Sequence, residues 1–117
     1  MFEIRKEQME VLGRHELEKF VVRMMAHLRE DFADYVQPMS DEQLREFVET
    51  GIATSKTYEV VDEDDVCIYI ECMAVYGRDF DTNPKTDWAG SILRQTDLDG
   101  FEKMKRVLDG ALFRAGE

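Results

Sequence analysis

Residues 62–77 read DEDDVCIYIECMAVYG, and this stretch decides the fold. Four carboxylates precede an apolar run that only Glu71 interrupts. Acidic side chains are stabilised at the positive end of a helix dipole, and the glycine at position 77 suits a helix C-terminus. The pattern predicts a helix over about 66–76 that is apolar nearly all round, and therefore the most buried element of the protein. A buried strand of a parallel sheet is the alternative interpretation.

The segments before this helix have the period of amphipathic helices. The first has apolar residues at helical spacing, namely Leu17, Phe20, Val21, Met24, Met25, Leu28 and Phe32, and a shorter helix is expected over 5–12. After Pro38, Ser40 and Gln43 fit a capping box, in which each side chain satisfies a backbone amide of the other residue. The helix that begins there is expected to turn inward Leu44, Phe47, Val48, Ile52 and Ala53.

Glycine at position 51 lies beside this inward stripe. Because a glycine inside a helix costs about 1 kcal/mol, a packing reason such as close approach of a neighbouring helix is expected. Residues 58–61 are rich in β-branched side chains, but no second alternating run exists to pair with them. They are interpreted as the end of a helix and a connection.

Two further helices are expected after the loop at 78–85. Thr86 or Asp87 caps a short helix that contains Trp88, and Asp97 or Asp99 opens the last one. The inward face of the last helix is expected to be Phe101, Met104, Val107, Leu108, Ala111 and Leu112, with Lys103 mostly off it. The predicted fold class is all-α: residues 1–117 form a compact single-domain array of five or six helices around a central apolar helix at about 66–76.

The net charge of −11 is concentrated in the middle of the chain, where residues 40–87 hold 13 acidic and 4 basic residues. Such a field repels phosphate backbones and anionic lipids, so nucleic acid and membrane are not expected as partners. The expected partner is a protein with a basic surface. The candidate partner-binding residues are Glu46, Glu49, Glu59, Asp62, Glu63 and Asp64. The alternative is that this acidity only keeps the protein in solution.

The cysteines and histidines form no recognisable motif. Cys67 and Cys72 are five residues apart on one expected helix, so they cannot easily pair, and two buried thiols fit a reducing compartment. With neither a signal peptide nor a membrane span in view, the cytoplasm is the expected location. His15 and His27 belong to no metal or catalytic pattern, so no metal and no cofactor is predicted.

The loop that contains Gly77, Arg78, Asp79, Phe80 and Asp81 continues to Asn83, and its residues 79–83 resemble the opening of a calcium loop, with oxygen ligands at positions 79, 81 and 83. Pro84 and Gly90 then stand where such a loop needs a glycine and a glutamate. The loop residues 77–81 and Trp88 are therefore predicted to be structural. Phe80 is expected to anchor the loop in the core, while Asp79 and Asp81 cap loop amides or pair with Arg78. Neither a nucleophile elbow nor a phosphate-binding glycine loop is found, so no enzymatic activity is expected.

The chain resembles a group of small helical bacterial proteins. The resemblance lies in residues 65–70, in the Gly-Arg-Asp-Phe-Asp loop with its flanking tyrosine at 76–81, in residues 88–89 and 92–93, and in 27–29 and 51–52. It implies a cytoplasmic protein that is often encoded beside secreted toxins or type VI secretion effectors, and it brings no catalytic motif. The function expected is a non-enzymatic accessory or adaptor protein that acts on a toxin or secretion component. The alternative is a toxin-neutralising protein whose acidic face mimics nucleic-acid phosphates.

Overall fold

The computed structural model describes residues 13–115 and confirms the all-α fold class. Six α-helices and one 3-10 turn make up this part of the chain: α2 (Gly13–Asp31), α3 (Ala33–Val36), α4 (Asp41–Thr57), α5 (Glu63–Tyr76), η1 (Pro84–Thr86), α6 (Asp87–Leu93) and α7 (Gly100–Ala115). The helix expected over 5–12 lies outside the described residues. Among the described helices, none combines the length and the apolar character that crossing a membrane requires.

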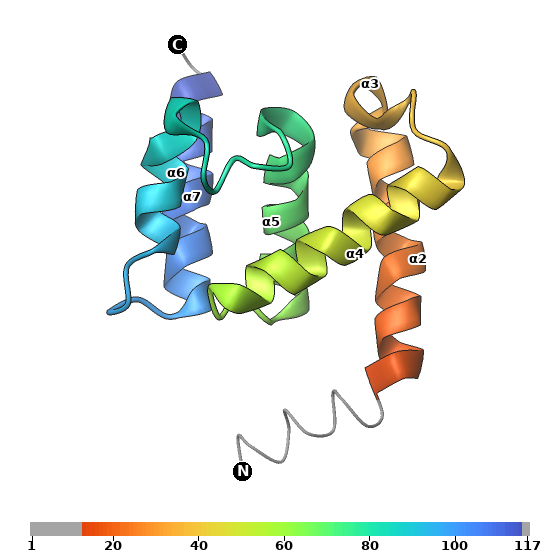
Figure 1. The fold of residues 1–117 in the computed structure, drawn as a ribbon, viewed down its shortest axis with the longest axis horizontal. Helices are drawn as coiled ribbons and strands as arrows, with labels where there is room; N and C mark the ends of the chain where they lie inside the picture. Colours follow the sequence, from red (N-terminus) through yellow and green to blue (C-terminus); the bar gives the residue numbers. More distant parts are fainter. Residues whose placement is uncertain (1–12, 116–117) are drawn as a thin grey trace.

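The helices are arranged around α5 (Figure 1). In this view α2 lies on one side of α5, the pair α6 and α7 lies on the other, and α4 runs obliquely across α2 and α5. Helix α5 contacts α2, α3, α4 and α7. The strand alternative for this segment is therefore wrong, because α5 is a helix covered from several sides.

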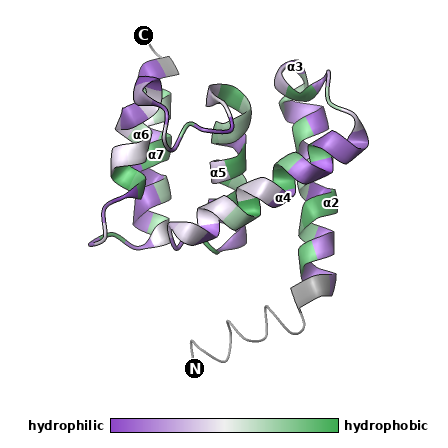
Figure 2. Ribbon diagram, in the orientation of Figure 1, coloured by the Kyte–Doolittle hydropathy of each residue, from purple (hydrophilic) through white to green (hydrophobic). Residues whose placement is uncertain are grey.

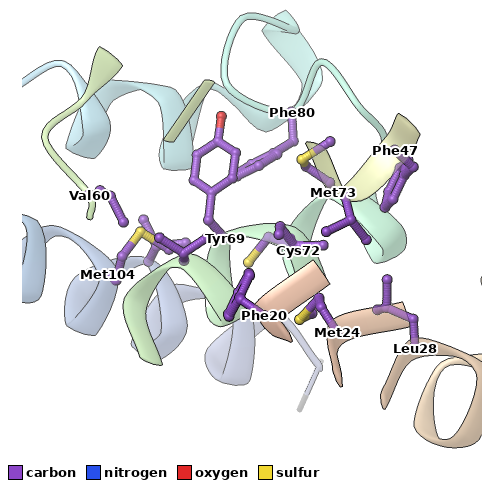
Figure 3. Packing of buried hydrophobic residues seen from close by; sticks show 14 of the residues in the cluster. Phe20, Met24, Leu28, Phe47, Val60, Tyr69, Cys72, Met73, Phe80 and Met104 are labelled. Atoms are coloured by element: carbon purple, nitrogen blue, oxygen red, sulfur yellow. The ribbon is translucent and has the colours of Figure 1, made fainter. Parts of the chain in front are cut away.

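The core is built on the buried residues of α5. Tyr69, Ile70 and Met73 have at most 1% of their surface exposed, and Phe20, Met24 and Leu28 of α2 approach the same cluster (Figure 3). Figure 2 shows the corresponding apolar faces turned toward the middle of the molecule. The expected burial fails at the C-terminal turn of α5, where Val75 is 38% exposed. The helix ends at Tyr76, and Gly77 follows it with a φ of 111°, which glycine adopts without strain.

Helix α4 begins at the predicted cap, and it packs as the sequence predicts except at Ala53. The Ser40 hydroxyl accepts a hydrogen bond from the Gln43 amide, and the Gln43 side chain accepts one from the Ser40 amide, which completes the capping box. A side chain at position 51 would place its Cβ 2.6 Å from Ile70 Cγ1, so the glycine lets α4 cross α5 closely. Ala53, expected to face inward, is exposed.

Helix α2 differs from the prediction at both ends of its apolar series. Leu17 is 47% exposed, because the first turns of α2 extend beyond the elements that bury Phe20 and Val21. At the other end α2 stops at Asp31, and the short α3 follows, which the sequence pattern does not announce. Arg29 fixes this turn by donating to the carbonyl oxygens of Val36 and Met39.

The inward face of α7 is narrower than expected. Met104 and Val107 are buried, whereas three residues assigned to that face are exposed: Phe101 (63%), Leu108 (37%) and Leu112 (63%). Lys103, which the sequence pattern places off the face, is buried, and its ammonium group donates to the Tyr58 carbonyl oxygen at 2.9 Å. The helix begins at the expected cap, since Asp99 accepts a hydrogen bond from the Glu102 amide.

Candidate functional site

The six acidic residues predicted to bind a partner do not form one face. Glu46 forms an ion pair with Arg78 at 2.7 Å, beyond the C-terminal end of α5, whereas Asp62 precedes the N-terminal end of the same helix. A helix of this length separates the two ends by about 20 Å. The hydrogen bond from Arg78 lowers the pKa of Glu46, and the Arg78 guanidinium also lies over the Phe47 ring. The Glu46 carboxylate is therefore already paired within the chain.

Two more of the six residues are also paired. Glu63 accepts a hydrogen bond from Arg23 of α2 at 2.7 Å. Glu49 lies 3.8 Å from Arg45, whose guanidinium donates two hydrogen bonds to Glu18. These pairs join helices to one another or support α4. Their carboxylates therefore stabilise the fold, which a count of charges along the sequence does not reveal.

The other three of the six residues lie near the points where α5 and α7 begin, and Asp99, the cap of α7, joins them although it was not predicted to bind a partner. We call Glu59, Asp62, Asp64 and Asp99 the acidic end. Asp65 lies beneath them, and burial together with the neighbouring carboxylates of Asp62, Asp64 and Asp99 raises its pKa. The segment before α5 and the first residue of α7 are in direct contact, because a Cβ at Gly100 would lie 2.5 Å from the Glu59 carbonyl oxygen.

The loop after α5 is fastened to the core at several points. Phe80 is fully buried, with its ring centroid 4.9 Å from that of Tyr69. Asp81 accepts a hydrogen bond from the Tyr58 hydroxyl at 2.7 Å, and burial, together with this contact, raises the pKa of Tyr58 to about 12. Arg78 does not pair with Asp79 or Asp81 as expected, since it reaches Glu46 instead.

Two other members of the predicted structural set, Asp79 and Trp88, stabilise the loop itself and the helix that follows it. Asp79 accepts a hydrogen bond of 3.4 Å from the Asn83 side chain and so closes the loop on itself. Trp88 of α6 packs against Tyr76 in a T-shaped arrangement and lies beneath the Arg114 guanidinium of α7. The contacts of Trp88 therefore connect the end of α5 with α6 and α7.

A cluster of chemically capable side chains lies between α2 and α5. His27 of α2 contacts Glu71 of α5, with 2.5 Å between Nε2 and Oε2, and Cys67 donates from its thiol to the same carboxylate oxygen at 3.6 Å. On the other side of the imidazole ring, Nδ1 lies 3.2 Å from Asp31 Oδ2. One imidazole, one thiol and two carboxylates therefore converge, and we call His27, Cys67, Glu71 and Asp31 the interhelical cluster.

The thiol in this cluster is not set up as a nucleophile. Burial, reinforced by the Glu71 carboxylate, raises the pKa of Cys67 to about 12, so the thiol keeps its proton near neutral pH. Reactive cysteines have a lowered pKa beside cationic groups. The histidine and the carboxylates are better suited to form hydrogen bonds with one another or to hold a cation.

Sequence reasoning missed the interhelical cluster because His27 and Cys67 are 40 residues apart, and no motif spans that separation. The sequence does show part of the cluster as residue spacings on each helix. Cys67 and Glu71 are four residues apart on α5, and His27 and Asp31 are four apart on α2, so each pair lies on one helix face. What the sequence does not encode locally is that these two faces meet.

Comparison with protein-family models, with curated proteins and with solved structures finds no match to this chain.

Proposed function

We propose that the chain is a non-enzymatic protein-binding module, an accessory or adaptor protein that engages a toxin or secretion component in the bacterial cytoplasm. The partner presents a basic surface, and it meets the acidic end. The observation that carries the proposal is the combination of acidic and exposed apolar side chains at this place. The class of partner and the location rest on the sequence resemblance.

Two exposed apolar residues accompany the carboxylates of the acidic end. Phe101 is 63% exposed in the first turn of α7, and Val61 is 36% exposed directly before Asp62. Gly100 lies against the backbone of Glu59 and Val60. Phe101 is the next residue after Gly100, and Val61 is the next residue after Val60, so both lie beside this contact. An apolar centre with a charged rim is the usual anatomy of a protein interface, and an exposed aromatic side chain is a typical binding hot spot.

The backbone at Glu59 is also unusual. Its φ of 64° is one that non-glycine residues rarely adopt, and it turns the chain sharply where α4 ends. Val60 is thereby buried, and its amide donates to the Ser55 carbonyl oxygen at 3.0 Å. The turn presents the exposed Glu59 and Val61 side chains on either side of this anchor.

The test compares three full-length proteins as bait in the native cytoplasm. They are the wild type, a variant with Glu59→Gln, Asp62→Asn and Asp64→Asn, and a control with Glu30→Gln, Asp34→Asn and Asp109→Asn. The control removes the same charge from exposed sites elsewhere. A partner that depends on the acidic end is retained by the wild type and the control and lost by the first variant.

The purified partner then allows a kinetic measurement. Association through complementary charge should slow as salt rises, and the acidic-end variant should associate more slowly with a flatter salt dependence. Binding that is the same for all three proteins and indifferent to salt would overturn the assignment of this surface. Phe101→Ala should weaken the same complex mainly by faster dissociation.

The toxin-neutralising alternative is favoured by one observation, the density of carboxylates around Asp65. Besides burial, the carboxylates of Asp62, Asp64 and Asp99 each lie close enough to Asp65 to raise its pKa. A dense negative surface of this kind can occupy a nuclease site in place of phosphates. Inhibition of a nuclease partner that is competitive with its nucleic-acid substrate would select this alternative over the adaptor.

A further inference from the structure

We propose that His27, Cys67 and Glu71 form a binding site for one divalent transition-metal ion of the zinc class, with Asp31 as the group that orients the histidine. These residues lie within the interhelical cluster, and none of them carries the proposed function. The inference therefore stands or falls separately from the binding module.

The donor set selects the class of metal. Zinc is bound in proteins by imidazole nitrogen, thiolate sulfur and carboxylate oxygen, and the cluster offers one of each. Calcium and magnesium take oxygen ligands almost exclusively, so a site with nitrogen and sulfur donors disfavours them. A zinc-type ion is the cation that this combination suits.

The distances between the donor atoms are close to those of a tetrahedral site. Zinc bond lengths place neighbouring ligand atoms about 3.3–3.7 Å apart. Cys67 Sγ and Glu71 Oε2 are 3.6 Å apart, and the three donor atoms all lie within 4.8 Å of one another. His27 Nε2 and Glu71 Oε2 are at hydrogen-bonding distance, 2.5 Å, and must separate by about 1 Å when an ion enters. Rotation of the Glu71 side chain is enough for this, because it has three rotatable bonds.

The histidine is oriented as metal-bound histidines usually are. Such a ring typically presents one nitrogen to the metal and its other nitrogen to a carboxylate that fixes the ring. Here Nδ1 faces Asp31 Oδ2 at 3.2 Å, and the Phe32 ring packs edge-on against the imidazole at 5.6 Å between centroids. This second layer of contacts is an observation independent of the three donor atoms.

Access to the cluster comes from an open cavity of about 200 Å³. His27 and Cys67 line it together with Asp64, and the His27 and Glu71 side chains are 33% and 25% exposed. An ion can enter from this side, and a water molecule can fill its fourth position. Three protein ligands with one open position are the arrangement of zinc sites that exchange ligands, whereas purely structural sites are closed.

Metal binding balances without any change of oxidation state. The ion forms bonds to Nε2, Sγ and Oε2. It displaces the thiol proton of Cys67 and the proton of the hydrogen bond between His27 and Glu71, and both protons pass to solvent.

The test is a titration of the metal-free full chain with Co²⁺. We expect a thiolate-to-cobalt charge-transfer band in the near ultraviolet and the visible bands of tetrahedral cobalt, saturating at one ion per chain. Zn²⁺ should displace the cobalt and abolish the spectrum. Cys67→Ser should remove the charge-transfer band, and His27→Gln and Glu71→Gln should each weaken cobalt binding at least about tenfold.

The controls separate this site from the acidic surface and from the second thiol. Cys72→Ser and His15→Gln, which change the other free cysteine and an exposed histidine, should leave the cobalt spectrum unchanged. Ca²⁺ and Mg²⁺ at the same concentration should not displace cobalt. A wild-type protein with no charge-transfer band, or one whose cobalt is displaced equally by Ca²⁺, would overturn the proposal even if a variant fails to fold.

Discussion

Two tyrosines contact the same loop, but only one of their hydroxyl groups has a hydrogen-bond partner among the described residues. The Tyr58 hydroxyl donates to Asp81 at 2.7 Å, whereas the buried Tyr69 hydroxyl has no partner among the described residues. A buried polar group without a partner costs about 1–3 kcal/mol, and so does leaving Asp81 without its donor. Tyr69→Phe should therefore leave the free energy of unfolding unchanged or raise it, while Tyr58→Phe should lower it by about 1–3 kcal/mol.

Urea denaturation at neutral pH measures both variants, and each variant serves as the control for the other because both remove the same single oxygen atom. If Tyr69→Phe proves as costly as Tyr58→Phe, the Tyr69 hydroxyl has a partner such as a buried water molecule, and the assignment of an unsatisfied group is wrong.

Asp65 makes stability depend on pH. Its pKa is raised in the folded protein, so the folded state holds this proton more tightly than the unfolded chain does. The ionised carboxylate costs stability at neutral pH, and this cost disappears as the pH falls through the folded-state pKa toward the unfolded value of about 3.9. The free energy of unfolding of Asp65→Asn, relative to that of the wild type, should therefore rise between acidic and neutral pH. Denaturant titrations at a series of pH values measure it, and a difference that stays constant or falls would contradict the prediction.

At the scale of elements, the crossing of α4 and α5 depends on one glycine. A Cβ at position 51 would meet Ile70 Cγ1 at 2.6 Å and Met73 Sδ at 2.9 Å, and both neighbours are packed in the core. Gly51→Ala should cost about 1–3 kcal/mol through overpacking, although alanine favours helix by about 1 kcal/mol. Ala53→Gly, at an exposed position of the same helix, is the matched control and should cost about 1 kcal/mol through propensity alone. A thermal melt in which Gly51→Ala is more stable than the wild type would show that the helices can move apart.

The elements that the sequence predicted well are those with local signals. The capping box at Ser40, the cap at Asp99 and the apolar run of α5 each depend on neighbouring residues, and the structure has all three. The failures concern which side of a helix finds a neighbour. Lys103 and Phe101 exchange the places expected of them, because the carbonyl oxygen of Tyr58 accepts a hydrogen bond from the lysine and no described element covers the phenylalanine.

The same distinction applies to the candidate sites. Sequence counting located the excess of acidic residues, but it could not separate Glu46, which Arg78 neutralises across the fold, from Asp62 and Asp64, for which the described residues show no ion pair. It could not find the interhelical cluster either, since the meeting of His27 with Cys67 is a product of how α2 packs on α5. Charges and donors can be counted along a chain, whereas their partners depend on tertiary packing.

For the whole molecule, the decisive quantity is the balance between ion pairs and repulsion. The net charge is −11, the described ion pairs use many carboxylates, and the acidic end concentrates several carboxylates that they do not use. Repulsion among exposed charges weakens as the Debye length falls from about 30 Å at 0.01 M salt to about 8 Å at 0.15 M. We therefore expect the Tm to rise over this range, because self-repulsion destabilises the compact state.

The variant with Glu59→Gln, Asp62→Asn and Asp64→Asn should have a higher Tm than the wild type in low salt and a smaller response to salt. For a chain of this size, each 1 kcal/mol of relieved repulsion corresponds to roughly 4–6 °C. The control with Glu30→Gln, Asp34→Asn and Asp109→Asn removes equal charge from scattered sites, so its Tm should change less. A Tm that falls with salt would mean that intramolecular ion pairs outweigh the repulsion. If the acidic end proves costly to stability, its charge is better explained by a basic partner than by solubility, which dispersed charges would serve equally well.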